Sequence, residues 1–168
     1  MIFGGGAADW LFGGAGNDQL YGNDGNDVVS GDAGNDQDDG GAGNDLIYAG
    51  DDADTVLGNA GVDTIYGGAG ADSLDGGADN DTIYGGLNTT SVASGADSID
   101  GGLGNDLIYA EDGADTVLGN DGQDTVYGGA GADSLDGGAD NDTIYGGDDS
   151  TGASSGADSI DGGAGNDL

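Results

Sequence analysis

The chain of 168 residues contains no lysine, arginine, histidine, cysteine or proline. Without a cationic side chain it has no group that neutralises phosphates or anionic lipid headgroups, so neither nucleic acid nor an acidic membrane surface is expected as a partner. Without cysteine, no disulfide and no thiolate metal site can hold the fold together. Because histidine bases and lysine or cysteine nucleophiles are also absent, we expect a protein that is not an enzyme.

The sequence also lacks long hydrophobic runs. No stretch approaches the roughly 18 apolar residues of a membrane span, and residues 1–10 lack the basic start of a signal peptide. The formal net charge is −34, and so acidic a chain with few large aliphatic residues is expected to remain disordered by itself. It can fold only if cations cancel the charge.

Glycine is abundant, with 42 residues, and most of the glycines belong to tandem nonapeptides. The clearest copies are GGAGNDQLY, GGAGNDLIY, GGAGADSLD and GGADNDTIY, which begin at residues 13, 40, 67 and 76. Blocks of nine follow one another from Gly4 onward, except where seven-residue insertions at 88–94 and 149–155 lengthen two of them. We therefore expect one repeat domain over residues 1–168, with a loop at each insertion.

Two positions of the block are nearly invariant. Position eight is a large aliphatic residue in every complete block except one, where Asp38 stands instead. Glycine is usual at positions one, two and four, where it permits positive φ angles and close approach of the backbone. Position six is always aspartate, namely Asp9, Asp18, Asp27, Asp36, Asp45, Asp54, Asp63, Asp72, Asp81, Asp97, Asp106, Asp115, Asp124, Asp133, Asp142, Asp158 and Asp167.

This block pattern predicts a solenoid. The first six residues should form a tight turn with inward carbonyls, and the last three a minimal strand whose position-eight side chain points inward. One block buries a single side chain, so the blocks must coil and stack their strands in parallel to build a continuous core. A closed coil needs strands on two opposed sides. We therefore expect two blocks, or eighteen residues, in each turn and two short-strand sheets.

The stacking brings like charges together. Aspartates about 5 Å apart on successive turns would repel strongly, because no basic side chain lies between them. A divalent cation between turns reverses that interaction, and a shell of carboxylates and turn carbonyls suits calcium better than zinc or magnesium. Seventeen turn segments in two columns leave up to about 15 gaps. One Ca²⁺ in each gap would reduce the net charge to about −4.

The block resembles the GGxGxDxUx signature of the repeats-in-toxin (RTX), or hemolysin-type, calcium-binding family. The resemblance extends from Gly4 to Leu168 and implies an all-β fold, a right-handed parallel β-roll solenoid with calcium between its turns. It further implies that the position-six aspartates are metal ligands and that turn glycines contribute carbonyl ligands. Members of this family leave bacteria unfolded by type I secretion and fold in external calcium, so the resemblance implies an extracellular protein.

All seven tyrosines occupy position nine of their blocks. With two blocks per turn, six of them align on one sheet as a ladder about 24 Å long. Two interpretations remain open: cross-strand stacking that stabilises the outer face, and a contact surface for a sugar, a second roll or a neighbouring filament. The six residues are Tyr48, Tyr66, Tyr84, Tyr109, Tyr127 and Tyr145.

Two classes of function fit these features. The first is a calcium-dependent extracellular structural or adhesive protein, such as a cell-surface, surface-layer or filament component. The second is a calcium-triggered folding and secretion module of a larger toxin or hydrolase. Ice binding is a minor alternative, because RTX-type ice-binding proteins display ordered threonines in their turns and position three here is mostly alanine or aspartate. Uncapped strand edges at the ends indicate either a longer array or end-to-end self-association.

Overall fold

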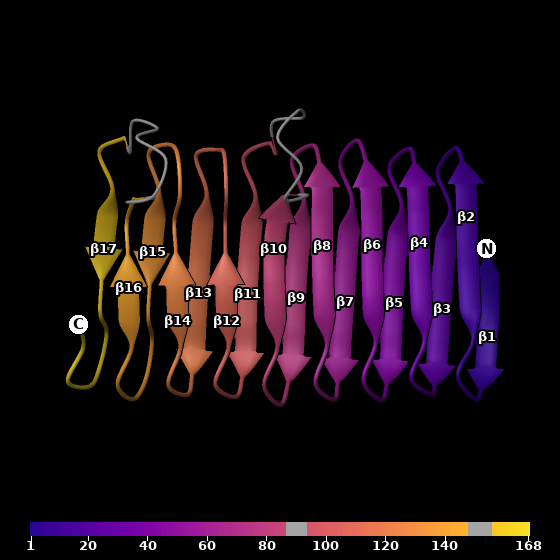
Figure 1. Ribbon diagram of the computed structural model, residues 1–168, viewed down its shortest axis with the longest axis horizontal. Coiled ribbons are helices and arrows are strands. Elements are labelled where there is room, and N and C mark those ends of the chain that lie inside the picture. Colours follow the sequence, from indigo (N-terminus) through magenta and orange to yellow (C-terminus); the bar gives the residue numbers. More distant parts are fainter. Residues whose placement is uncertain (87–93, 148–155) are drawn as a thin grey trace.

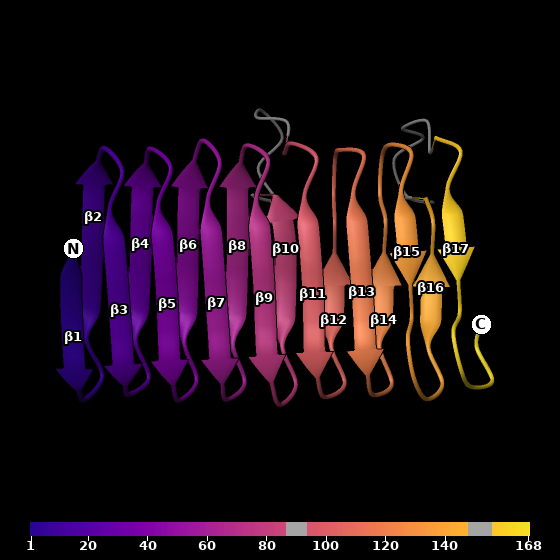
Figure 2. The same cartoon turned by 180° about the vertical axis from the view of Figure 1, so that it is seen from behind.

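The computed structural model describes residues 1–86, 94–147 and 156–168, and this part of the chain consists of strands and turns without a helix. Seventeen strands form two sheets that lie against each other, and the two ends of the chain lie at opposite ends of an elongated coil (Figure 1). The view from behind shows the second layer, whose strands run in the opposite direction to those of the first (Figure 2). The predicted all-β solenoid with two sheets is confirmed.

The two sheets alternate along the chain. The nine-stranded sheet contains β1 (Ile2–Gly6), β3 (Gln19–Asp24), β5 (Gln37–Ala42), β7 (Thr55–Ala60), β9 (Ser73–Ala78), β11 (Ser98–Leu103), β13 (Thr116–Asp121), β15 (Ser134–Asp136) and β17 (Ser159–Asp161). The eight-stranded sheet contains β2 (Trp10–Ala15), β4 (Val28–Ala33), β6 (Leu46–Asp51), β8 (Thr64–Ala69), β10 (Thr82–Gly86), β12 (Leu107–Tyr109), β14 (Thr125–Tyr127) and β16 (Thr143–Tyr145).

Every strand pairs in parallel with the strand one full turn away. Ile47 of β6 lies opposite Ile65 of β8, which is the predicted spacing of eighteen residues. Leu74 of β9 lies opposite Ile99 of β11, twenty-five residues further along. The difference equals the length of the first insertion, so the insertion leaves the register of the sheet unchanged.

The hydrophobic core is a double row of position-eight side chains between the two sheets. Their inward direction follows from the alternation of side chains along a strand. Ile160 of the last strand, β17, is 52 % exposed because that strand has a partner on one side only. The buried members of the row are Leu11, Leu20, Val29, Ile47, Val56, Ile65, Leu74, Ile83, Ile99, Ile108, Val117, Val126 and Leu135.

The strands are longer than the three residues expected from the block. Strand β6 continues through positions one to three of the following block, and most strands before β12 do the same. Position one therefore lies inside a strand and faces inward. A Cβ atom at Gly22 would lie 2.5 Å from Oδ2 of Asp27 and 2.2 Å from the carbonyl oxygen of Gly40. Glycine is needed at Gly22 for close packing, although Ala49 and Ala110 occupy position one of two other blocks. The turn itself is confined to positions four to six.

The two insertions lie mainly outside the described residues. The one at 149–155 lies entirely outside them, and of the one at 88–94 only Ser94 is described. The Ser94 hydroxyl donates to the carbonyl of Asp112 at 2.6 Å and accepts from its N–H at 3.0 Å, eighteen residues away. Ser94 therefore occupies the place of position three in its block, and the chain resumes the repeat frame one residue earlier than the sequence pattern suggested.

Among the described residues, no helix is long and apolar enough to cross a membrane.

Candidate metal centres

All seventeen position-six aspartates lie in two columns, one along each edge of the roll, and all but Asp167 stand immediately before a strand. Each column therefore repeats once per turn, as the two-block turn predicted. The column that precedes the eight-stranded sheet contains Asp9, Asp27, Asp45, Asp63, Asp81, Asp106, Asp124, Asp142 and Asp167. The column that precedes the nine-stranded sheet contains Asp18, Asp36, Asp54, Asp72, Asp97, Asp115, Asp133 and Asp158.

Within each column, one carboxylate oxygen ties neighbouring turns together. The backbone N–H of Asp45 donates to Oδ1 of Asp63 at 2.7 Å, and the N–H of Asp63 donates to Oδ1 of Asp81 at 2.8 Å. The same bond joins every neighbouring pair of both columns, fifteen bonds in all, at 2.7 to 3.2 Å. These fifteen contacts lie at the fifteen gaps between turns that the repeat predicts.

The other carboxylate oxygen is buried without a hydrogen-bond donor. In the described part of the chain, Oδ2 has no donor within reach in thirteen of these aspartates. Desolvating a carboxylate oxygen is expensive unless a donor or a cation compensates it. The chain supplies no cationic side chain, so compensation must come from solvent. The thirteen are Asp27, Asp36, Asp45, Asp54, Asp63, Asp72, Asp81, Asp97, Asp106, Asp115, Asp124, Asp133 and Asp142.

The pKa values of the column aspartates also indicate that their charge needs compensation. Burial raises the pKa of Asp63 and of Asp81 to about 7, although the backbone N–H that each accepts lowers it. Burial likewise raises the pKa of Asp45 to about 6. The negative charges of the neighbouring aspartates add to the increase in each case. Ionising the folded columns is therefore harder than ionising exposed aspartates, and a bound cation would favour the ionised form.

Backbone carbonyls provide the second group of oxygen donors. At position four, successive turns approach so closely that a Cβ atom on Gly43 would lie 1.8 Å from the carbonyl oxygen of Gly25. The φ angle of Gly43 is +125°, in the left-handed region that glycine favours. Where position four is aspartate, the residue takes a φ near +80°, as in Asp52 and Asp79. The turns therefore place carbonyl oxygens directly beneath the next turn.

The donor set favours a hard cation bound by mixed oxygen ligands. Among the described residues, no three acidic side chains come close enough to hold a metal ion by themselves. A shell at these gaps must therefore combine the carboxylates of adjacent turns with turn carbonyls and water. Calcium accepts six to eight such oxygens in flexible geometry, whereas magnesium requires a near-octahedral shell. The residues present fit calcium.

A parallel β-roll with an aspartate column along each edge is the architecture of a calcium-binding repeat protein. The chain matches the family model of the RTX calcium-binding nonapeptide repeat (4 copies) over residues 3–38, 39–65, 57–89, 93–126, 118–150 and 153–168. These matches cover nearly the whole sequence, so the chain belongs to this family, whose repeats bind calcium. The RTX roll is a structural fold that is generally not catalytic, and proteins that contain it are typically secreted. No curated protein matches the chain.

Asp38 lies outside both columns and inside the hydrophobic core. It pairs in register with Leu20 and Val56, is 2 % exposed, and has no hydrogen-bond donor to either carboxylate oxygen among the described residues. Burial, together with the charges of Asp36 and Asp54, raises the pKa of Asp38 to about 8. The sequence identified Asp38 as an exception at position eight, but its complete burial depends on the turns that cover it on both sides.

The six aligned tyrosines form one continuous stack on the outer face of the eight-stranded sheet. Neighbouring ring centroids are 4.8 to 5.1 Å apart, and the ring planes differ by 3 to 11°. The predicted alignment is therefore observed, and rings one turn apart are in contact along its whole length. Whether this surface contacts a partner remains a prediction.

Proposed function

We propose that this chain is a calcium-dependent structural or adhesive repeat protein that acts outside the cell and folds as calcium binds between its turns. One observation supports this function above all others: thirteen buried carboxylate oxygens without a donor, in a chain without cationic side chains. The position-six aspartates would supply the carboxylate ligands and the turns the carbonyl ligands. Calcium would then supply the positive charge that allows the columns to remain ionised.

The affinity needed for this role is low. Extracellular calcium modules bind with dissociation constants of roughly 10⁻⁴ to 10⁻³ M. With sites of that strength, the chain would remain unfolded at cytosolic calcium concentrations and fold once it is exported. Calcium binding would thus restrict the folded, functional state to the extracellular space.

A circular dichroism titration tests the proposal. At pH 7.5 the metal-free chain should give a coil spectrum that changes cooperatively to a β spectrum as calcium approaches the millimolar range. Excess chelator should reverse the change. Magnesium at the same concentration is the control for ionic strength and divalent charge, and it should substitute poorly. A metal-free chain that keeps its β spectrum at pH 7.5 in chelator would refute the proposal.

For the tyrosine stack we propose first a stabilising role and second a contact surface. Stacked aromatic rings on adjacent strands stabilise a sheet by about 0.5–1.5 kcal/mol per pair. Replacing Tyr66, Tyr84 and Tyr109 together by serine separates the two roles. A higher calcium requirement for folding, with self-association unchanged, assigns the stack to stability. Lost association of a normally folded variant, measured by sedimentation velocity, assigns it to contact.

A further inference from the structure

The aromatic row of the eight-stranded sheet is interrupted at one position. Along position nine, Phe12 of β2 lies opposite Ser30 of β4, and Ser30 lies opposite Tyr48 of β6. Tyr48 stacks on Tyr66 with ring centroids 5.0 Å apart, but among the described residues no aromatic ring stacks on the side of Tyr48 that faces β4. Ser30 therefore leaves a vacant place the size of one ring at the end of the stack.

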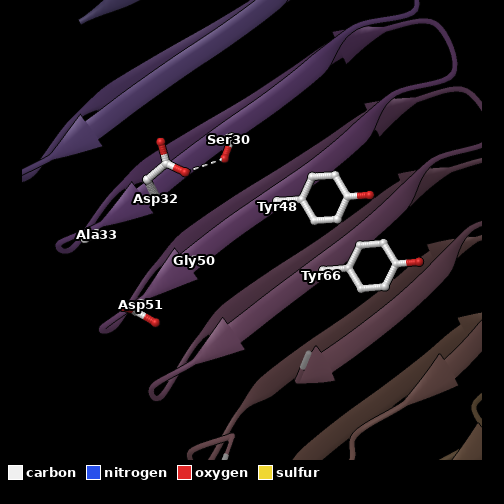
Figure 3. A pocket seen from close by; sticks show the side chains of 7 residues that line it. All are labelled: Ser30, Asp32, Ala33, Tyr48, Gly50, Asp51 and Tyr66. Carbon is white, nitrogen blue, oxygen red and sulfur yellow. Dashed lines mark hydrogen bonds between the residues drawn. The ribbon is translucent and has the colours of Figure 1, made fainter. Parts of the chain in front are cut away.

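A hollow of about 370 Å³ lies beside this vacant place. Its walls come from three neighbouring strands of the eight-stranded sheet. Strand β4 contributes Ser30 and Asp32, β6 contributes Asp51 and the ring of Tyr48, and β8 contributes the ring of Tyr66 (Figure 3). The Ser30 hydroxyl donates to Oδ1 of Asp32 at 2.9 Å, which holds that carboxylate at the edge of the hollow (Figure 3). On β6, Gly50 at position two of its block also lines the hollow and contributes no side chain to fill it.

The charges at the hollow select a cationic occupant. Asp32 and Asp51 both line it, and the chain has no lysine, arginine or histidine that could pair with them. The two unpaired carboxylates at the hollow disfavour an anionic ligand there. A metal ion would use the carboxylates and leave the aromatic wall unused, and it is far smaller than the hollow. A neutral sugar could stack on the ring but would leave the charge uncompensated.

A planar cation would interact with the aromatic wall and with the two carboxylates at the same time. A guanidinium group stacks on aromatic rings and at the same time pairs with carboxylates through its fork of N–H donors. Its flat shape suits a place that a ring would otherwise occupy. Lysine lacks that shape, because its ammonium is a compact point charge.

We propose that this hollow, at the interrupted end of the tyrosine stack, binds an arginine side chain of a partner protein. The guanidinium continues the stack beyond Tyr48 and pairs with the carboxylates of Asp32 and Asp51. The 168 residues of this chain contain no arginine, so the side chain comes from a partner segment with an exposed arginine. The site goes beyond calcium binding and calcium-dependent folding.

The test is an NMR titration of the ¹⁵N-labelled, calcium-saturated protein with the peptide acetyl-Gly-Arg-Gly-amide at low salt. We expect shifts confined to the backbone amides of residues 30–33, 48–51 and 66. The matched lysine peptide should bind about three- to fivefold more weakly, because it gains less from stacking and cannot form the forked pairing. Methyl glucoside, the probe for a sugar site, should cause no shifts.

Four variants localise the binding, and each introduces a residue that the repeat accommodates elsewhere. Asp32→Asn introduces an asparagine at position two, where another block has Asn59. Asp51→Ala introduces an alanine at position three, where another block has Ala33. Each should weaken binding of the arginine peptide about two- to fivefold, the effect of losing one exposed ion pair. Ser30→Tyr should abolish binding by filling the vacant place. Asp121→Ala is the matched control, with the same change of charge at position three on the other sheet, and it should leave binding unchanged.

Three results would overturn the proposal. Equal shifts with the arginine and lysine peptides, spread over the acidic surface, would show non-specific attraction. Binding of methyl glucoside at residues 30–33 and 48–51 would assign the hollow to a sugar. Unchanged arginine binding in Ser30→Tyr would place the site elsewhere. Because all of these experiments use calcium-saturated protein with a verified β spectrum, their failure is distinguishable from failure of calcium-dependent folding.

Discussion

Replacing Asp38 by valine should stabilise the roll, although it removes one of the aspartates that make up almost all of the chain's charge. The Asp38 carboxyl is 2 % exposed, lies between Leu20 and Val56 of the neighbouring strands, and has no hydrogen-bond donor among the described residues. Every other complete block has a large aliphatic residue at this position. Valine would therefore restore the pattern that the rest of the core follows.

The size of the effect follows from the pKa of Asp38. Burial raises this pKa from 3.8 to about 8, so at pH 7 the carboxyl is largely protonated in the folded chain and ionised in the unfolded chain. Each pKa unit between 3.8 and the ambient pH corresponds to 1.36 kcal/mol, which gives a penalty of about 4 kcal/mol at pH 7. A buried valine adds about 1.5–3 kcal/mol. The penalty should disappear below about pH 4, where both states bind the proton.

Urea unfolding in saturating calcium at pH 7.5, 5.5 and 4.0 measures this prediction as the difference between Asp38→Val and the unmodified chain. Using the difference cancels the effect of pH on calcium binding, which both chains share. Asp136→Leu is the control, because position nine of the same sheet holds Leu57 and Leu118 and faces outward. It should change the free energy of unfolding by less than about 0.5 kcal/mol. A stabilisation by Asp38→Val that is absent at pH 7.5, or that does not shrink at pH 4.0, would refute the reasoning.

Three further predictions follow from the columns and turns. Asp63→Asn should keep the turn-to-turn bond through Oδ1 but lower the calcium affinity of its gaps at least 10- to 100-fold, measured by isothermal titration, because losing even an outer-shell partner has that effect. Gly43→Ala should destabilise the calcium-bound roll by about 1–3 kcal/mol more than Gly16→Ala. Both glycines occupy position four with positive φ, but only the Cβ at residue 43 meets a carbonyl oxygen, whereas nothing lies within 4 Å at residue 16; equal urea midpoints would contradict this. In metal-free buffer, lowering the pH from 7.5 to 4.5 should increase the β signal in circular dichroism, because burial raises the pKa of Asp54, Asp63 and other column residues to about 7. Such groups bind more protons when folded, so stability is lost as pH rises from about 4 to 7.

The repeat made most of the fold predictable from the sequence. A period of nine with one inward side chain per block determines the coil, the eighteen-residue turn and the two aspartate columns, since each follows from strand alternation and closure. Strand length was underestimated, because glycine at position one was interpreted as a turn residue. Gly22 is in fact needed where a Cβ would meet Asp27 and the next turn. That steric requirement arises between turns, so a single block does not contain it.

The candidate sites were predictable only in part, because some of their contacts arise between stacked turns. The sequence identified which aspartates align, but not that Oδ1 accepts the N–H of the preceding turn while Oδ2 is left buried without a donor. This division of one carboxylate between two tasks exists only once two turns are stacked. The hollow beside Tyr48 was also missed. The signal was present as Ser30, the serine that interrupts an otherwise aromatic row, but its meaning depends on which strands lie side by side.

The columns also determine how folding should spread along the chain. Each gap is formed by two turns, so an ion bound in one gap would order both of these turns. Each ordered turn also forms one side of the neighbouring gap, which would then bind its ion more readily. Such nearest-neighbour coupling makes a repeat array fold cooperatively along its axis. The insertions do not interrupt it, because Asp72 N–H still donates to Oδ1 of Asp97 at 2.9 Å and Asp133 N–H to Oδ1 of Asp158 at 3.2 Å. We therefore expect the described turns to fold as one cooperative unit, with calcium filling both columns in a single transition.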